Sequence, residues 1–294
     1  MKVRNIGLVV LSLWPVSAYA TTTFVDLGTA GSFAVLAGST VTNTGMTNVL
    51  GDLGVWPGTA ITAFPPGIVS DGTTYAGDAI AMQAQSDLSV AYNSAASAPC
   101  GTTLSGQDLG GLTLTPGVYC FGSSAQLTGK LTLDAQGDPN AVFLFQIVST
   151  LTTASSSSVV FTNGGQGNGL FWQVGSSATL GPTTEFAGNI LAFTSITLNT
   201  GANIQCGSAL AQNGAVTMDT NNVYGCGAGV SGVPEPGTAT LLSIGLLLIS
   251  LSVYGRPSRK HATQDLYQAR DQESGFPVTA NPDAPIPHIC TPRG

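Results

Sequence analysis

The chain of 294 residues has only 8% charged residues, 38 glycines and a formal net charge of −7, whereas charged residues make up about 25% of a typical globular protein. Lys130 is the one cation between Arg4 and Arg256, which excludes nucleic-acid binding because that function needs clustered Lys and Arg. Both histidines, His261 and His288, lie near the C-terminus, so the main domain is expected to hold no histidine-based catalytic triad, no zinc site and no cofactor.

Residues 1–20 have the pattern of a secretory signal peptide. Lys2 and Arg4 give the positive start, a short apolar stretch follows, and Ala18-Tyr19-Ala20 forms an A-x-A cleavage site. The alternative is an N-terminal membrane anchor, but the apolar stretch is shorter than the ~20 residues that a membrane span needs. We therefore expect export and a mature domain over residues 21–232.

One long helix is predicted at about residues 76–98. This segment is rich in alanine and has no glycine between Gly77 and Cys100. Apolar residues recur in it at helical spacing. They are Ile80, Ala84, Leu88, Ala91, Tyr92 and Ala95. We expect this amphipathic face to pack along the rest of the domain.

The remainder of the domain shows a repeat of about 19 residues. A Thr-Leu pair recurs, with Thr-Met as one variant. The pairs begin at Thr113, Thr132, Thr150, Thr179, Thr197 and Thr217. This period suits one coil of a three-sided β-solenoid, whose coils must stack to bury their apolar residues. A β-sandwich of short strands is the alternative, and the regular spacing favours a β-solenoid with one helix packed alongside.

Four cysteines in the mature domain fall into two pairs with equal spacing. Cys100 and Cys120 are 20 residues apart, as are Cys206 and Cys226. Because an exported protein folds where disulfides form, we expect each cysteine to pair with its near neighbour. Free buried thiols are the alternative, and Cys290 remains unassigned.

The C-terminal segment begins with Val233-Pro234-Glu235-Pro236, continues with a mostly apolar run over 238–254, and reaches a basic cluster by Lys260. This order resembles the PEP-CTERM sorting signal of Gram-negative bacteria over 233–260. The resemblance implies a transmembrane segment at 238–254, retention at the membrane or cell surface, and processing by an exosortase; a plain single-span anchor is the alternative. The polar tail 261–294 contains several prolines and is expected to be disordered.

Several motifs of the main domain occur in the order found in one family of proteins. Leu27-Gly28-Thr29-Ala30-Gly31-Ser32-Phe33 opens the domain, Leu112 to Tyr119 reads LTLTPGVY, and Gly207 to Gln212 reads GSALAQ. Over about residues 24–226 the chain resembles the microbial ice-binding family. The resemblance implies a discontinuous three-faced β-solenoid (β-helix) with one long helix alongside, and ice as the partner of one flat face.

The ice-face motif that the resemblance implies, T-[A/G]-x-[T/N], occurs three times. The candidate residues at its two ends are Thr44 and Thr47, Thr59 and Thr62, and Thr200 and Asn203. A structural explanation is that Thr-Gly pairs suit strands and corners. Thr-x-Thr does not recur in every coil, and Lys130 or a carboxylate would interrupt the face if it pointed there.

Two functions follow as hypotheses, and neither is enzymatic. The first is a secreted, surface-sorted ice-binding protein that adsorbs to ice or to ordered water through a Thr-rich face. The alternative is a surface or matrix adhesin of the same fold that binds exopolysaccharide or neighbouring cells, with Trp56, Tyr75 and Trp172 available to stack on sugars. Catalysis is not expected because the carboxylates are dispersed and only Asp134 and Asp138 lie close together, in a predicted turn.

Overall fold

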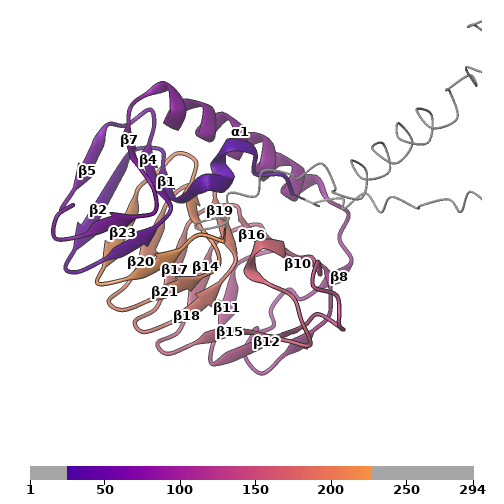
Figure 1. Cartoon of the computed structure of the whole chain (residues 1–294). Helices are drawn as coiled ribbons and strands as arrows, with labels where there is room; N and C mark the ends of the chain where they lie inside the picture. Colours follow the sequence, from indigo (N-terminus) through magenta and orange to yellow (C-terminus); the bar gives the residue numbers. More distant parts are fainter. Residues whose placement is uncertain (1–24, 227–294) are drawn as a thin grey trace, which may run out of the picture. The chain divides into compact units, whose positions relative to one another are not determined.

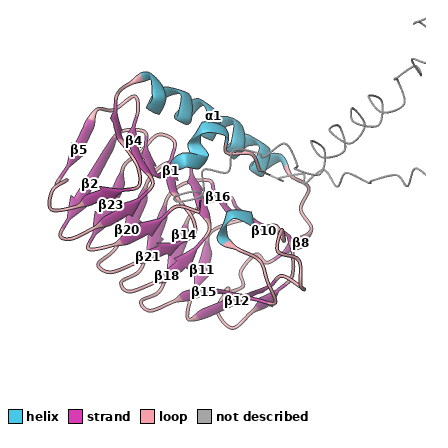
Figure 2. Cartoon of the chain, in the orientation of Figure 1, coloured by secondary structure: helices cyan, strands magenta, loops and turns pink. Residues whose placement is uncertain are grey.

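The computed structural model describes residues 25–226, which form a stack of short parallel strands with one long helix along its side (Figure 1). Each coil contributes one strand to each of three parallel sheets, which we call A, B and C. Figure 2 shows the strands of the stack in magenta and the one long helix, in cyan, running along one side of it. The prediction of a three-sided β-solenoid with one helix alongside is therefore confirmed.

Sheet A is the side that the helix covers. Its strands in spatial order are β7 (Thr74–Ala76), β4 (Asp52–Val55), β1 (Phe33–Ala37), β22 (Ala209–Ala211), β19 (Asn189–Ala192), β16 (Leu170–Val174), β13 (Phe143–Ile147), β10 (Gly117–Phe121) and β8 (Thr102–Thr103).

Sheets B and C form the other two sides. Sheet B contains β11 (Ala125–Leu127), β14 (Leu151–Thr153), β17 (Ala178–Leu180), β20 (Ile196–Leu198), β23 (Val216–Asp219), β2 (Thr40–Thr44) and β5 (Ala60–Thr62). Sheet C contains β6 (Ile68–Ser70), β3 (Asn48–Leu50), β24 (Asn222–Tyr224), β21 (Asn203–Gln205), β18 (Glu185–Ala187), β15 (Ser158–Thr162), β12 (Lys130–Asp134) and β9 (Thr113–Leu114).

Strand alternation explains why these segments form the walls of a solenoid. In β12, Leu131 and Leu133 are buried while Thr132 between them faces outward, as expected for side chains that alternate across a strand. The inward residues of all three sheets form one apolar core that is closed off from solvent. Because no coil buries its own apolar residues, stacking of neighbouring coils supplies the main stabilisation.

The coils do not stack in chain order. Strand β1 pairs with β4 on one side and with β22, from the end of the domain, on the other. Figure 1 accordingly shows the orange strands β20 and β23 beside the indigo strand β2. The helix explains this discontinuity, because it carries the chain along the stack from β7 toward β8, and the later coils then return to meet the first.

Helix α1 (Ala79–Ser97) begins at Asp78, whose carboxylate accepts hydrogen bonds from the amides of Ile80 and Ala81. Its bounds agree with the predicted segment, but the buried face is partly different. Ile80 is 50% exposed, so its assignment to the packing face is wrong, and the face starts at Ala81. The side chains that pack toward sheet A are Ala81, Ala84, Gln85, Leu88, Ala91 and Ala95.

A second apolar layer joins the helix to sheet A. Leu88 and Ala84 of the helix pack there with outward-facing residues of the sheet such as Leu191 and Leu210. A short 3-10 helix η1 (Gly28–Ser32) covers the same layer and is tied to α1 by Asp87. The helix is thus an integral cover of sheet A, which leaves sheets B and C as the two uncovered walls.

The link between Asp87 and Thr29 gives a pH-dependent contribution to stability. The Thr29 hydroxyl, 2.6 Å away, and its amide, 2.8 Å away, donate hydrogen bonds to Asp87 and hold the pKa of this carboxyl below its usual value. A lowered pKa stabilises the fold above the unfolded-state pKa of about 4, and the contribution is lost progressively as the pH falls from there through the lower folded-state pKa. We expect Asp87→Asn to lower the melting temperature by a few degrees at pH 7 and by less at pH 3.

The exposed carboxylate of Asp71 provides the control for this measurement. Asp71→Asn removes the same charge from an exposed turn of the solenoid between β6 (Ile68–Ser70) and β7 (Thr74–Ala76). Its melting temperature should follow the wild-type curve at both pH values. Equal losses for Asp87→Asn at pH 7 and pH 3 would contradict the assigned role of the ionised carboxylate.

Both predicted disulfides are present. Cys100–Cys120 ties the segment after α1 to β10, and Cys206–Cys226 ties the segment after β21 to the segment after β24. Each closes a loop with a sequence separation of 20 residues. Chain-entropy arithmetic gives about 3 kcal/mol of stabilisation for a loop of this size.

Because the loops are equally long, replacing either pair by serine should lower the free energy of unfolding by a similar amount, about 3 kcal/mol. The Cys206→Ser/Cys226→Ser and Cys100→Ser/Cys120→Ser variants are compared by denaturant unfolding. A loss below about 1 kcal/mol in either variant would show that its bridge does not restrain the unfolded chain as argued.

Candidate functional site

Sheet B carries a continuous row of threonines along the middle of its outer surface. The strand registers place six threonines side by side, and Gln126 continues the row at one end. In spatial order the row is Gln126, Thr152, Thr179, Thr197, Thr217, Thr42 and Thr62. We call this row the threonine ladder. Its members are exposed or half-buried, whereas the residues on either side of each along its strand face inward.

Parallel stacking fixes the spacing of the ladder. Neighbouring strands of a sheet lie about 4.8 Å apart, so the hydroxyl and methyl groups repeat at that interval along the solenoid. The hydroxyls of Thr42 and Thr217 lie 3.2 Å apart and are hydrogen-bonded. β-branched side chains have restricted rotamers in strands, so each threonine holds its methyl and hydroxyl in a defined place.

A second row of small residues runs beside the ladder, toward sheet A. Thr40 pairs with Ala60, and Thr150 lies next to Ser124, to which its hydroxyl donates a 2.8 Å hydrogen bond. Ser177 and Ser195 belong to the same row and lie between Thr150 and Thr40. The uncovered surface of sheet B is therefore built mainly from Thr, Ser and Ala.

Charged groups are kept to the margins of this surface. Within residues 25–226, the sole cation, Lys130, begins β12 in sheet C and thus lies outside the ladder. Asp108 lies beyond Gln126 at one end of sheet B, where it accepts hydrogen bonds from the amides of Gly110 and Thr128. Sequence alone left open which face these charges use, and the structure places Lys130 and Asp108 outside the ladder.

One carboxylate lies at the edge where sheet B turns toward sheet C. Asp219 ends β23 beside Thr44 of β2, and it accepts hydrogen bonds from the hydroxyls of Thr200 and Thr220. Thr44 and Thr200 are exposed at this edge. These two motif residues therefore border the ladder without belonging to it.

Two other motif residues lie away from sheet B. Thr47 is 1% exposed; its hydroxyl donates to Asn43 and accepts a hydrogen bond from the amide of Asn221. It is a structural link between coils and cannot contact an external surface, so its candidate role is wrong. Asn203 begins β21 on sheet C and bonds to Glu185 and Asn222, so it does not share a face with the ladder.

The third motif, Thr59 to Thr62, ends in the ladder. Thr62 ends β5 and is the last member of the ladder, while Thr59 is exposed just before that strand. Of the six candidate residues, the structure thus brings Thr62 into the ladder and Thr44, Thr59 and Thr200 to its borders. It separates Thr47 and Asn203 from it.

The aromatic candidates also differ in accessibility. Trp172 is fully buried and stacked on Phe145, with ring centroids 4.1 Å apart. Tyr75 is half-buried beside Phe33 in the layer under the helix. Trp56 is half-buried in the turn after β4 and lines a hollow. Trp172 is therefore closed to solvent, whereas Trp56 and Tyr75 each keep part of their surface exposed.

The carboxylates offer no catalytic constellation within the part of the chain that the structure describes. Asp134 accepts hydrogen bonds from the amide of Gln136 and the side chain of Asn163, and Asp138 accepts one from the amide of Asn140. These are turn-stabilising contacts, as the sequence predicts. Residues 25–226 contain no group of three or more His, Cys, Asp or Glu side chains arranged to hold a metal.

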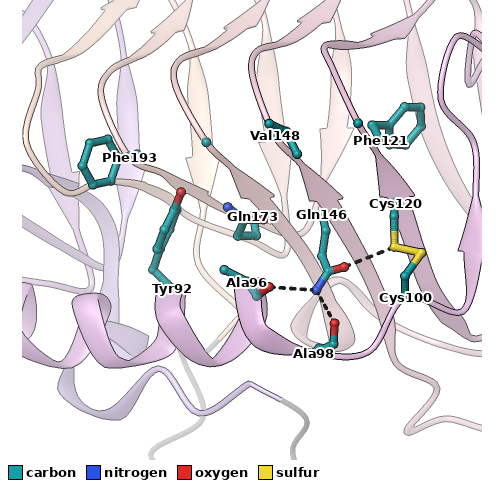
Figure 3. Close-up of a pocket in the computed structure, with 12 residues that line it drawn as sticks. Tyr92, Ala96, Ala98, Cys100, Cys120, Phe121, Gln146, Val148, Gln173 and Phe193 are labelled. Carbon is teal, nitrogen blue, oxygen red and sulfur yellow. Dashed lines mark hydrogen bonds between the residues drawn. A yellow bond between two sulfur atoms is a disulfide. The ribbon is translucent and has the colours of Figure 1, made fainter.

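A hollow of about 570 Å³ opens between the C-terminal half of α1 and sheet A (Figure 3). Gln146 lies at its base and serves the helix: its amide nitrogen donates hydrogen bonds to the carbonyl oxygens of Ala95 and Ala98, at 2.7 and 2.8 Å. Tyr92 and Phe193 face each other at the far end. Gln146 thus caps the last carbonyls of the helix, which is a structural role.

Comparison with known proteins now assigns the fold to a family. The model of the family described as Ice-binding-like matches residues 35–224, which include every strand of the threonine ladder. The chain belongs to the ice-binding-like family. The match leaves out the segments on either side, 1–34 and 225–294.

Relatives in the ice-binding-like family share both sequence and structure with this chain. An ice-binding protein of Nostoc sp. (strain HG1) is 55% identical over 259 residues, which are 85% of this chain and 95% of that protein. An ice-binding protein of Flavobacterium frigoris (strain PS1) is 32% identical and covers 68% of this chain and 75% of its own. The crystal structure of an ice-binding protein from an Antarctic biological consortium has a TM-score of 0.66 and 48% identity, and covers 75% of this chain and 96% of that one.

Proposed function

We propose that this protein binds ice through the threonine ladder of sheet B and so restrains ice growth. The observation that carries the proposal is the in-register row of six threonines, with no charged side chain between Gln126 and Thr62 among the described residues. The ice-binding relatives described above support the same assignment. No catalytic role is proposed.

The ladder has the chemistry that a solid water surface requires. Hydroxyls anchor bridging waters through hydrogen bonds, while the methyls beside them resist full solvation. A charged side chain would order its own hydration shell instead, which is why the absence of charge from the ladder matters. Regular repetition at about 4.8 Å lets many such waters be held at once.

Rigidity makes weak individual contacts sufficient. Binding loses affinity when side chains and loops must first be ordered, and the solenoid has already met this cost in folding. Each ladder threonine stands on a strand that is hydrogen-bonded on both sides, except at the two ends of sheet B. We therefore expect the central members, Thr197 and Thr217, to contribute most.

The direct test is the growth of ice crystals in solutions of the purified full chain. The proposal predicts faceted crystals and a freezing point that is lowered below the melting point, with a gap that increases with protein concentration. Round crystals and no gap at high protein concentration would overturn it.

Delivery to the outside of the cell is a second part of the proposal. We infer that residues 1–20 direct export and that 233–260 act as a PEP-CTERM-like sorting signal, processed by an exosortase, which leaves the domain at the cell surface or outside the cell. These segments lie outside the described residues, as does the predicted span 238–254. Residues 25–226 contain no helix that is long and apolar enough to cross a membrane. The two disulfides support export because they form in oxidising compartments.

Mass spectrometry of the protein recovered from culture medium and from washed cells tests this part. We expect a mature N-terminus at Thr21 and a C-terminus shortened within 233–260. An intact Met1 in the cytoplasmic fraction would contradict the export assignment. Exopolysaccharide as a partner at the surface follows only from the resemblance of the sorting signal.

A further inference from the structure

Buried polar side chains gather along one corner of the solenoid, where sheet B turns into sheet C. Six of the ten buried polar side chains in residues 25–226 lie at this corner. They are Asn43, Thr47, Thr153, Ser157, Thr184 and Asn221. We call this row the corner spine. Its members are at most 7% exposed, so the spine follows the edge of sheet B without offering a contact surface to ice.

The corner spine joins each coil to the next one. Its hydroxyl and amide groups donate hydrogen bonds across the boundary between coils, mostly to main-chain carbonyl oxygens that the turn leaves without a strand partner. The acceptors are the carbonyl oxygens of Leu127, Ala154, Asn199, Ala202 and Ala63. Buried carbonyl groups need such partners, and the spine supplies them from neighbouring coils.

One boundary between coils differs from all the others. In sheet B, β2 of the first coil pairs with β23 of the last, and in sheet C, β3 pairs with β24. We call this boundary the seam; Figure 1 shows it where indigo β2 lies beside orange β23. Every other pair of neighbours in sheet B comes from coils that are consecutive in the stack and in the chain. At the seam the register therefore depends on noncovalent contacts alone.

Thr47 crosses the seam from the inside. The main-chain N–H of Asn221, in the last coil, donates a 3.1 Å hydrogen bond to the Thr47 hydroxyl. The same hydroxyl donates to the side-chain oxygen of Asn43, in the first coil. Since a hydroxyl has one donor and acceptor lone pairs, Thr47 uses both functions to join the two coils. Thr47 is 1% exposed, so water does not replace these bonds.

The seam also divides the threonine ladder. Thr42 and Thr62 stand on the first-coil side, and the other four threonines stand on the last-coil side. The hydroxyls of Thr42 and Thr217 meet across it at 3.2 Å. The ladder can act as one surface only while the seam holds these two groups in line, because ordered waters that bridge several hydroxyls need a regular spacing.

We infer that Thr47 is a positioning residue for the ladder, whose hydroxyl holds Thr42 and Thr62 in line with the threonines across the seam. The inference rests on the proposed function of the ladder. It gives the motif Thr44-Gly45-Met46-Thr47 a role that does not require its last residue to touch ice. The hydroxyl acts through the register of β2 against β23.

Thr47→Val tests this role because it keeps the size of the side chain and removes the hydroxyl. We expect the gap between melting and freezing temperatures to fall about threefold at equal protein concentration, the size of effect that loss of one hydrogen bond produces. Thr47→Ser retains the hydroxyl and should restore the wild-type gap. Circular dichroism at the assay temperature checks that each full-length variant is folded.

Thr184→Val is the matched control for a purely structural effect. Thr184 is 0% exposed and belongs to the same spine, but its hydroxyl contacts Thr153 and Ala154 of the coil that precedes it in the chain. Its melting temperature should fall by as much as that of Thr47→Val, while its ice activity stays at the wild-type level. A wild-type gap in Thr47→Val, or equal losses of activity in both variants, would overturn the inference.

Amide hydrogen exchange provides a readout that does not depend on ice. The amides of β2 and β23 should exchange faster in Thr47→Val than in the wild type or in Thr184→Val, because the seam opens locally. Unchanged exchange at these strands would overturn the inference even if the activity fell.

A second substitution separates positioning from contact with ice. Thr42→Tyr should lower the activity of the wild type, but it should have much less effect in Thr47→Val, where Thr42 is already out of line. Fully additive losses would contradict the role of Thr47. If the wild type leaves ice crystals round, the proposed function fails first; if it shapes them and Thr47→Val does so equally well, only the positioning role fails.

Discussion

Replacing Thr197 and Thr217 by tyrosine is expected to lower ice-growth inhibition by about tenfold or more at equal protein concentration, because central residues of a rigid contact surface carry most of its binding energy. Both threonines lie in the middle of the ladder on the adjacent strands β20 and β23. Each tyrosine ring would stand above the neighbouring methyls and hydroxyls and hold the surface away from ice. The measurement is the gap between melting and freezing temperatures as a function of concentration.

Two paired variants make this result specific to the ladder. Thr113→Tyr/Thr132→Tyr places the same rings on adjacent strands of sheet C and should leave the activity unchanged. Thr44→Tyr/Thr200→Tyr alters the edge of sheet B and should give an intermediate loss. An equal loss from the sheet C variant and the ladder variant would contradict the assignment of ice binding to sheet B.

Replacing Trp172 by alanine is expected to lower the free energy of unfolding by about 4 kcal/mol, the range found for large aromatic residues in cores. Trp172 is 0% exposed and lies between Phe145 and Phe186, with ring centroids at 4.1 and 4.9 Å. Its indole nitrogen also donates a 3.0 Å hydrogen bond to the carbonyl oxygen of Ala187. Truncation therefore opens a cavity in the middle of the stack and leaves a buried acceptor unpaired.

The loss can be divided between packing and hydrogen bonding. Trp172→Phe retains an aromatic ring but cannot donate to Ala187, so we expect a smaller loss of about 2 kcal/mol. Denaturant unfolding of the three proteins gives both values. A Trp172→Ala variant as stable as the wild type would show that the ring does not support the core.

The local pattern of the sequence was enough to predict the class of fold and part of the ladder. The Thr-Leu period of about 19 residues predicts short stacked strands, and Thr179, Thr197 and Thr217 are indeed neighbours on sheet B. The same pair at Thr113 and Thr132 lies on sheet C instead. A repeat interval predicts stacking but does not specify which of three sides a residue faces.

The complete ladder could not be predicted because it depends on pairing between distant parts of the chain. Thr42 lies beside Thr217 although 175 residues separate them, and only the discontinuous order of coils brings them together. A search for Thr-x-Thr within single coils misses a ladder that takes one threonine from each coil. Aligning the residue after the first buried position of each sheet B strand would have found it.

Two of the three matches to the four-residue motif led to the corner rather than to the face, and the third reached the ladder at Thr62. Thr44 ends β2 in sheet B, whereas Thr47 is already inside the turn to sheet C, and Asn203 begins a strand of sheet C. Because these two matches span the corner between sheets B and C, the two ends of each cannot point in one direction. The disulfides, in contrast, were predictable from spacing alone, since each joins cysteines at equivalent positions about one coil apart.

Adsorption of fluorescently labelled protein to a growing single crystal of ice tests the central claim most directly. The wild type and the Thr113→Tyr/Thr132→Tyr variant are predicted to label the crystal as it grows, while Thr197→Tyr/Thr217→Tyr stays in the liquid although circular dichroism shows that it is folded. Labelling of the crystal by the folded ladder variant at the wild-type level would contradict the account.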